Sequence, residues 1–100
     1  MPQSLPTVIV SAPVPPVLRE AIEAASRIVD VPTGQRLDEA VSAADRAVAR
    51  GVLCTVRTPV DAATLEALPA VKVVSNFAVG YDNVDVPRAT QGGVLVCNTP

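Results

Sequence analysis

The chain has 100 residues, which is enough for one domain with its own core. An apolar content of 49% excludes a disordered segment, and a net charge of −2 without a basic cluster argues against nucleic acid as a partner. Histidine is absent, which excludes a Ser-His-Asp triad and a Cys/His zinc site. Because only 2% of the residues are aromatic and Val and Ala dominate, the core must consist of small and β-branched side chains.

Short β-branched runs predict five strands, each apolar on both faces. The strands are expected at residues 7–10, 27–31, 52–56, 71–75 and 94–97. Apolar positions at helical spacing predict four helices between them. The helices are expected at residues 15–25, 37–44 with an extension toward 49, 61–68 and 85–91.

Several residues mark where these helices begin and end. Pro15 and Pro16 suit a first helical turn, where a missing N–H costs nothing. Asp61 and Asp85 are expected as N-caps, and Gly51 is expected to stop the second helix. Strands that alternate with helices predict an α/β fold with right-handed crossovers. We expect a flavodoxin-like, doubly wound, parallel five-stranded sheet with strand order 2-1-3-4-5.

Ligands bind such sheets outside the carboxyl ends of the strands. Three loops qualify, at residues 11–16, 55–59 and 76–83, and the third is the most informative. There Val79 and Gly80 follow a strand directly, and consecutive backbone N–H groups could hold a carboxylate. The alternative is a plain turn with Gly80 at positive φ.

Arg57 follows the third strand on the same rim and could pair with an anionic substrate. The alternatives are a solvated arginine or one bonded to Asp61. Thr55 and Thr58 are expected to serve turns and caps. Phe77 and Tyr81 could line a pocket or cover one end of the sheet.

The remaining polar and sulfur residues are given structural roles. Cys54 and Cys97 lie in apolar runs without a CxxC motif, which predicts buried free thiols and a reducing, cytoplasmic compartment. Asp82 and Asp85 look like a metal pair, but capping by Asp85 is the better account, so no metal site is expected. No apolar run is long enough to span a bilayer and no signal peptide is indicated, so no membrane partner is expected.

Phosphate-binding motifs are missing from the sequence. No GxGxxG follows a strand and no GxxxxGK[ST] occurs. A response regulator would need an acidic cluster and a lysine in the fifth strand, whereas the only lysine is Lys72. We therefore expect no cofactor-binding residue in this chain.

The second half of the chain carries a distinctive pattern. The words GVLCTVRTPVDAATLEA at 51–67 and LPAVKVVSNFAVGYDNVDVPRATQGGVLVCNTP at 68–100 resemble the D-isomer-specific 2-hydroxyacid dehydrogenases, most of all the glyoxylate and hydroxypyruvate reductases. The resemblance implies that Val79 and Gly80 hold the substrate carboxylate through backbone N–H groups. It implies that Val56 and Arg57 border the substrate, and that Asn98 and Thr99 lie where the chain crosses toward the cofactor domain.

In that family the NAD(P) fingerprint and the catalytic Arg, Glu and His lie beyond the equivalent of Pro100. The resemblance therefore implies that residues 1–100 are the N-terminal segment of a substrate-binding domain that is completed elsewhere, including a helix from the far C-terminal end. We expect the parent enzyme to reduce a short 2-oxo acid with NAD(P)H, and this chain alone to hold no catalytic residue and no cofactor and to be inactive.

Two other readings stay open. The chain could be a stand-alone module that binds small carboxylates without turning them over. It could instead be a self-associating α/β domain, because loss of the covering segments would expose apolar surface and favour a homo-oligomer.

Overall fold

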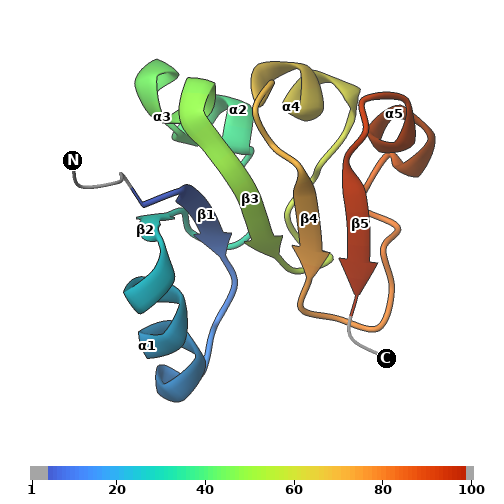
Figure 1. Cartoon of the computed structure of the whole chain (residues 1–100). Helices are drawn as coiled ribbons and strands as arrows, with labels where there is room; N and C mark the ends of the chain where they lie inside the picture. The colour runs from blue at the N-terminus through green and yellow to red at the C-terminus, as the bar shows by residue number, and fades with distance from the viewer. Residues whose placement is uncertain (1–4, 99–100) are drawn as a thin grey trace.

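A computed structural model describes residues 5–98 of the chain. Five parallel strands form one sheet in the order β2-β1-β3-β4-β5, as predicted (Figure 1). Helices join the strands and flank the sheet, so the fold is α/β and flavodoxin-like. The strands are β1 (Thr7–Ser11), β2 (Arg27–Asp30), β3 (Ala49–Cys54), β4 (Val73–Asn76) and β5 (Leu95–Asn98).

The helices are α1 (Pro16–Ala25), α2 (Leu37–Ala40), α3 (Ala43–Val48), α4 (Ala62–Ala67) and α5 (Val86–Gln91). Both predicted aspartate caps are confirmed. The Asp61 carboxylate accepts a hydrogen bond from the Thr64 N–H, and the Asp85 carboxylate accepts one from the Arg88 N–H. Among residues 5–98, no helix has the length and apolar character needed to cross a membrane.

The structure corrects three boundaries. The predicted second helix is two helices, because the Ser42 hydroxyl accepts a hydrogen bond from the Asp45 N–H and starts a new helix there. Gly51 does not stop a helix, because β3 has already begun at Ala49 and Gly51 pairs with Val8. The third strand ends at Cys54, so Val56 lies in a turn and not in the strand.

The sheet has two unlike faces. In-register pairing places Ile9, Val52, Val74 and Val96 side by side on one face. This core face packs against apolar side chains of α2, α4 and α5, which form one buried cluster with it. Within the described chain, the cluster includes Leu37 of α2, Leu65 of α4 and Ala89 of α5 but no residue of α1.

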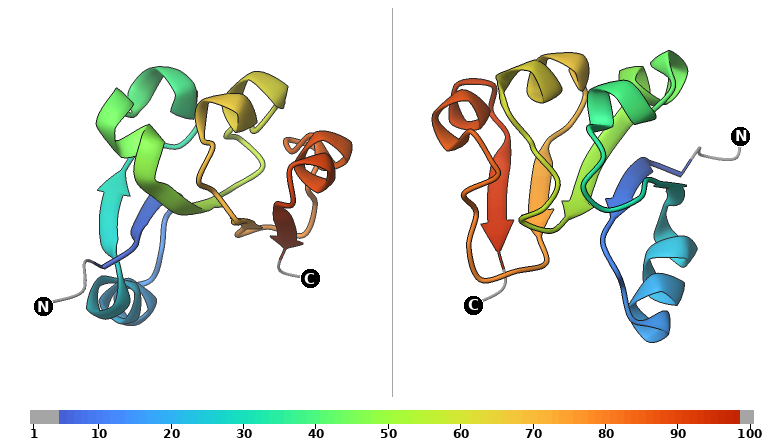
Figure 2. Two further views of the ribbon diagram at one scale, coloured as in Figure 1. Left: turned by 45° about the horizontal axis from the view of Figure 1, so that its top comes forward. Right: turned by 180° about the vertical axis from the view of Figure 1, so that it is seen from behind.

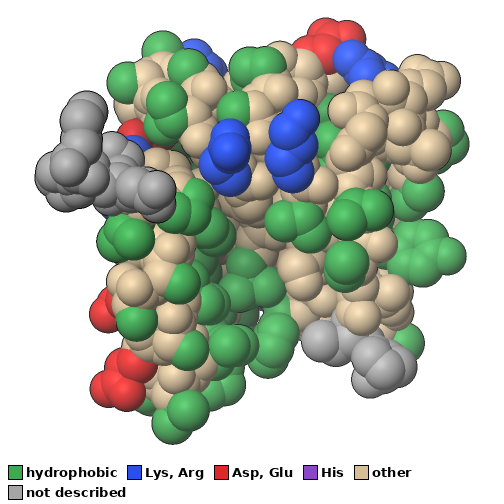
Figure 3. All heavy atoms as spheres, in the orientation of Figure 1, with side chains coloured by type: hydrophobic (Ala, Val, Ile, Leu, Met, Phe, Trp, Pro, Cys, Tyr) green, Lys and Arg blue, Asp and Glu red, His purple; other side chains and the backbone are tan. Residues whose placement is uncertain are grey.

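The opposite face, called here the open face, carries Val8, Val10, Gly51, Leu53, Val73, Ser75, Leu95 and Cys97. Among the described helices only α1 lies on this side, away from α2, α3 and α4 (Figure 2). The Arg19 guanidinium ties α1 to β2 by donating to both carboxylate oxygens of Asp30, at 2.8 and 2.7 Å. Next to α1, hydrophobic side chains surround a hollow of about 400 Å³ (Figure 3).

The two cysteines therefore differ. Cys54 is fully buried on the core face, as predicted. Cys97 is exposed, so its predicted burial is wrong. An apolar run indicates a strand, but Cys97 lies on the edge strand β5 and on the open face, where no described element covers it.

Candidate functional site

The last residues of four strands form a polar row at the carboxyl edge of the sheet. Register aligns Ser11 with Cys54, Cys54 with Asn76, and Asn76 with Asn98. We call these four residues the polar rung. Apolar pairs precede them on the same face, so the change to polar side chains coincides with the point where the loops begin.

Ser11 and Thr58 join three loops at this edge. The Ser11 hydroxyl donates to the Pro32 carbonyl at 3.2 Å and lies 3.1 Å from the Thr58 hydroxyl, which is completely buried. Because a hydroxyl has one proton, Thr58 donates to Ser11. The Thr58 oxygen also accepts from the Gly34 N–H at 3.2 Å. Thr58 thus serves a turn, as predicted, and fixes the loop after β3.

Asn76 and Asn83 connect the third loop to the second. The Asn76 Nδ2 donates to the Gly80 carbonyl at 2.9 Å and to the Asn83 Oδ1 at 2.7 Å. The Asn83 Nδ2 donates to the carbonyl oxygens of Thr55 at 3.1 Å and Thr58 at 2.8 Å. Sequence reasoning missed both asparagines, although two amides flanking a glycine-containing loop are a usable signal.

Cys54 completes this network as a neutral thiol. Its Sγ donates to the Asn76 Oδ1 at 3.1 Å. Burial raises the pKa of the Cys54 thiol to about 11, and a hydrogen bond from Asn83 opposes that rise. The thiolate is therefore scarcely populated at neutral pH, and Cys54 is a packing residue and not a nucleophile.

A hollow of about 400 Å³ opens at the same edge. Its lining residues come from the loops that follow β1, β2, β3 and β4. They are Pro13, Thr33, Thr55, Val56, Arg57, Phe77 and Ala78. The fold therefore brings the predicted residues Val56 and Arg57 to one hollow with the start of the loop at 76–83. Val79 and Gly80 follow Ala78 directly but do not line the hollow. Phe77 walls it, whereas Tyr81 lies outside it and is exposed.

The backbone around Gly80 is not crowded by neighbouring atoms, and several of its N–H groups have no acceptor among the described residues. Gly80 does not have positive φ, so the left-handed conformation expected for it in the plain-turn alternative is wrong. A Cβ placed on Gly80 would meet no atom within 4 Å. Within residues 5–98, the N–H groups of Ala78, Val79 and Gly80 donate to no protein acceptor. These donors remain available to a ligand.

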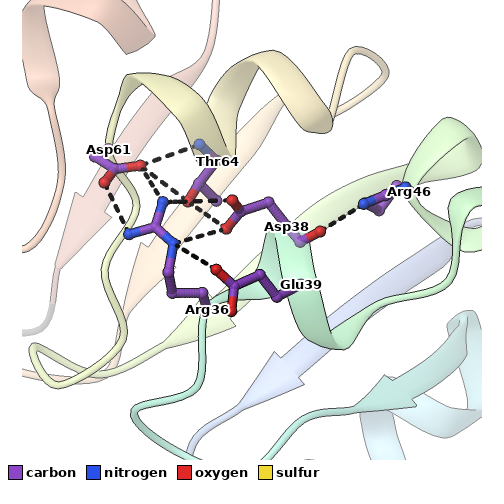
Figure 4. A network of polar contacts seen from close by, with 6 residues as sticks. All are labelled: Arg36, Asp38, Glu39, Arg46, Asp61 and Thr64. Carbon is purple, nitrogen blue, oxygen red and sulfur yellow. Dashed lines mark hydrogen bonds and ion pairs between the residues drawn. The ribbon is translucent and has the colours of Figure 1, made fainter.

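Arg57 does not pair with Asp61. The carboxylate of Asp61 instead receives two hydrogen bonds from the Arg36 guanidinium, at 2.9 and 3.0 Å (Figure 4). Arg36 and the Thr64 N–H hold the pKa of Asp61 well below its usual range. Asp38 and Glu39 also face Arg36, so this cluster links α2 to α4. Sequence analysis missed it, because its charges lie far apart in the chain.

The Arg57 guanidinium, by contrast, forms no ion pair within the described part of the chain. It is exposed and lines the hollow next to Ala78. A free guanidinium beside free N–H groups makes this edge suited to an anion.

The start of α1, which follows the first strand, does not fit the pyrophosphate of a dinucleotide cofactor. Such a cofactor needs helix N-terminal N–H groups after the first strand to hold its pyrophosphate. Here the N-cap of α1 is Pro15 and its first residue is Pro16, and proline has no N–H. The described residues also contain no group of three or more potential metal ligands.

A parallel α/β sheet with a hollow suited to an anion at its carboxyl edge is typical of ligand-binding α/β domains, and comparison with known proteins shows the family. Residues 8–100 match the model of the D-isomer specific 2-hydroxyacid dehydrogenase catalytic domain. The chain belongs to this family.

Individual relatives agree with the family match. A glyoxylate reductase from Korarchaeum cryptofilum is 52% identical over 42 residues, which are 42% of this chain and 13% of that protein. A D-3-phosphoglycerate dehydrogenase from Mycobacterium bovis is 40% identical over 99 residues, covering 97% of this chain and 18% of that protein. The chain thus matches less than a fifth of the length of these curated relatives.

A solved structure shows the same fold. It is an NADPH-dependent glyoxylate/hydroxypyruvate reductase from Sinorhizobium meliloti in complex with NADP and malonate. The identity is 29% and the TM-score 0.74, with 97% of this chain and 29% of that chain covered.

Proposed function

We propose that this chain is the substrate-binding portion of an NAD(P)-dependent D-2-hydroxyacid dehydrogenase of the glyoxylate/hydroxypyruvate reductase type. Its part is to hold the carboxylate of a short 2-oxo acid. The observation that carries the proposal is the hollow at the carboxyl edge, where the unpaired Arg57 guanidinium lies beside a loop with free N–H groups.

Each predicted residue has a stated part in this proposal. The N–H groups of Val79 and Gly80 donate to the substrate carboxylate, and Arg57 supplies positive charge. Val56 is 47% exposed beside Arg57 and gives the hollow an apolar wall. The malonate in the related reductase from Sinorhizobium meliloti supports a small carboxylate as ligand.

We further propose that residues 1–100 form the N-terminal segment of the substrate-binding domain, and that the NAD(P)-binding domain and a C-terminal helix lie outside these residues. The small share of its relatives that the chain matches and the uncovered open face support this division. In that arrangement this chain binds no cofactor and supplies no catalytic residue. The free cysteines favour a reducing, cytoplasmic compartment.

Binding is tested by titrating the chain with malonate and with glyoxylate in a calorimeter. We expect millimolar binding, and Arg57→Ala should weaken it by about five- to tenfold, because a charge-assisted contact is lost. Arg50→Ala is the matched control, since Arg50 is an exposed arginine on β3 that does not line the hollow. Equal loss in both variants, or no binding by the wild type, would refute the proposed site.

Activity is tested by mixing the chain with NADPH and glyoxylate and following NADPH absorbance. We expect no turnover above a blank. Carboxylate binding without turnover is also the expectation for a stand-alone binding module. The two differ if a polypeptide carrying the family's cofactor domain is added, because only a dehydrogenase portion gains activity.

A further inference from the structure

Two side-chain amides of the polar rung contact consecutive carbonyl groups of the loop at 76–83. The Asn98 Nδ2 donates a hydrogen bond to the Val79 carbonyl oxygen. The Asn76 Nδ2 donates to the Gly80 carbonyl oxygen at 2.9 Å. The amides therefore hold the peptide plane before Gly80 and the plane after it.

Holding a carbonyl also sets the direction of an N–H. A trans peptide unit is planar, so its C=O and N–H point in opposite directions. With the Val79 carbonyl directed toward Asn98, the Gly80 N–H points away from β5. With the Gly80 carbonyl directed toward Asn76, the Tyr81 N–H points away from the end of β4.

Asn76 is itself rigidly held. It is completely buried, and its two Nδ2 protons are both used, one on the Gly80 carbonyl and one on the Asn83 Oδ1. Its Oδ1 accepts from the Cys54 thiol. Asn83 in turn is bonded to the loop after β3. The position of Gly80 is thus tied to the segment that carries Arg57.

The backbone conformation of Gly80 depends on these hydrogen bonds. Glycine has the widest choice of backbone conformation, and here no side-chain contact limits it, because a Cβ would meet no atom within 4 Å. Rotation of the peptide plane between Val79 and Gly80 would turn the Gly80 N–H away from the ligand, and rotation of the next plane would change the backbone angles of Gly80 itself. Donors fixed before binding avoid that ordering cost.

We propose that Asn98 and Asn76 are positioning residues, which hold the peptide planes on both sides of Gly80 so that the Gly80 N–H is ready to receive a carboxylate. This inference rests on the proposed function, in which this loop binds the carboxylate of a 2-oxo acid.

The test uses Asn98, because it is exposed and its replacement leaves the core intact. In Asn98→Leu we expect the malonate dissociation constant to rise by about three- to tenfold, the loss of one hydrogen bond. Nuclear magnetic resonance of the free chain should show a lower order parameter for the Gly80 amide. The thermal midpoint should not move. Asn98→Gln keeps an amide donor and should recover affinity toward the wild-type value.

The control is Gln91→Leu, which removes an exposed amide from α5 and should change neither readout. Wild-type affinity and wild-type Gly80 order in Asn98→Leu would overturn the inference. A wild-type chain that fails to bind malonate would refute the proposed function alone. The Gly80 order parameter of the free variants would then still decide whether Asn98 positions the loop.

Discussion

The two faces of the sheet have similar strand residues and different surroundings. On the core face, Val74 is completely buried against the helices that follow β2, β3 and β4. On the open face, the neighbouring Val73 lines a hollow that no described helix fills, and Leu95 beside it is 69% exposed. The burial of a strand side chain therefore depends on whether a helix covers its face of the sheet, and not on the type of residue in the strand.

The comparison also explains where polar groups collect. Within the core face, the polar rung lies at the carboxyl edge, where loops provide hydrogen-bond partners for Ser11, Asn76 and Asn98, and Cys54 donates to Asn76. No buried side-chain polar atom in the described residues lacks a partner. The face that is packed is thus also the face that organises the candidate site.

The largest expected effect comes from substituting adjacent valines of β4. Val74→Ala should lower the free energy of unfolding by about 2 kcal/mol, because it removes two buried methyl groups and leaves a cavity. Val73→Ala should cost less than about 1 kcal/mol, because its side chain is only partly buried. Urea unfolding of both variants measures the difference. Equal losses would contradict the distinction between the faces.

A smaller loss is expected at the carboxyl edge. Thr58→Val keeps the shape of the side chain but removes the donor to Ser11 and the acceptor of the Gly34 N–H. We expect a loss of about 1–2 kcal/mol in the free energy of unfolding. Thr33→Val, on an exposed threonine near this edge, is the control. Thermal or urea unfolding compares the two, and an unchanged Thr58→Val would show that these bonds are dispensable.

The cluster around Arg36 should give a still smaller, pH-dependent effect. The pKa of Asp61 is lowered in the folded chain, so its contribution to stability is present above the unfolded pKa of about 4 and is lost as the pH falls below it. Asp61→Asn keeps the N-cap acceptor but loses the charge. Stability of this variant should therefore fall less than that of the wild type between about pH 5 and pH 3.

Unfolding by urea at several pH values measures this difference. Asp82→Asn is the control, because Asp82 is an exposed aspartate with no hydrogen bond to the described residues. The effect is small because the Asp61 side chain is 49% exposed and solvent screens the pair. Parallel pH profiles for wild type and Asp61→Asn would contradict the role of Arg36.

The smallest effect on stability is expected for Leu95→Lys on the open face, within about 0.5 kcal/mol of the wild type. The same change should reduce self-association of the isolated chain, because it places a charge in the uncovered apolar surface. Sedimentation velocity over a range of concentrations measures this. Val48→Lys replaces another exposed apolar residue, on α3, and serves as control. A wild-type chain that stays monomeric would count against association through this face.

Much of the fold could be predicted from local sequence. The alternation of β-branched runs with helical patterns indicated the sheet and its strand order, and Asp61 and Asp85 indicated helix starts, because a cap acts on its own first turn. The break at Ser42 was missed, because an apolar pattern continues through it. The burial of Cys97 was wrong for a different reason, since exposure depends on a covering layer that the strand itself does not encode.

The candidate site was only partly predictable. Arg57 and Gly80 could be selected because residues after strand ends gather at one rim of a parallel sheet. Sequence could not show that their hydrogen-bonding groups are free, because that depends on the tertiary structure. It also could not show that Asp61 pairs with Arg36, which lies 25 residues away in the chain. The hydrogen bonds of Asn76, Asn83 and Asn98 could not be predicted, because the tertiary fold brings their partners together.

The sequence alone determined the family, the order of the elements and the loops in which a ligand site can lie, because these follow from local pattern and from distinctive words after Gly51. Tertiary structure decided which strand face is packed, which cysteine is buried and which amides hold Gly80. Those properties arise from contacts between segments distant in the chain, and such contacts exist only after the sheet has formed.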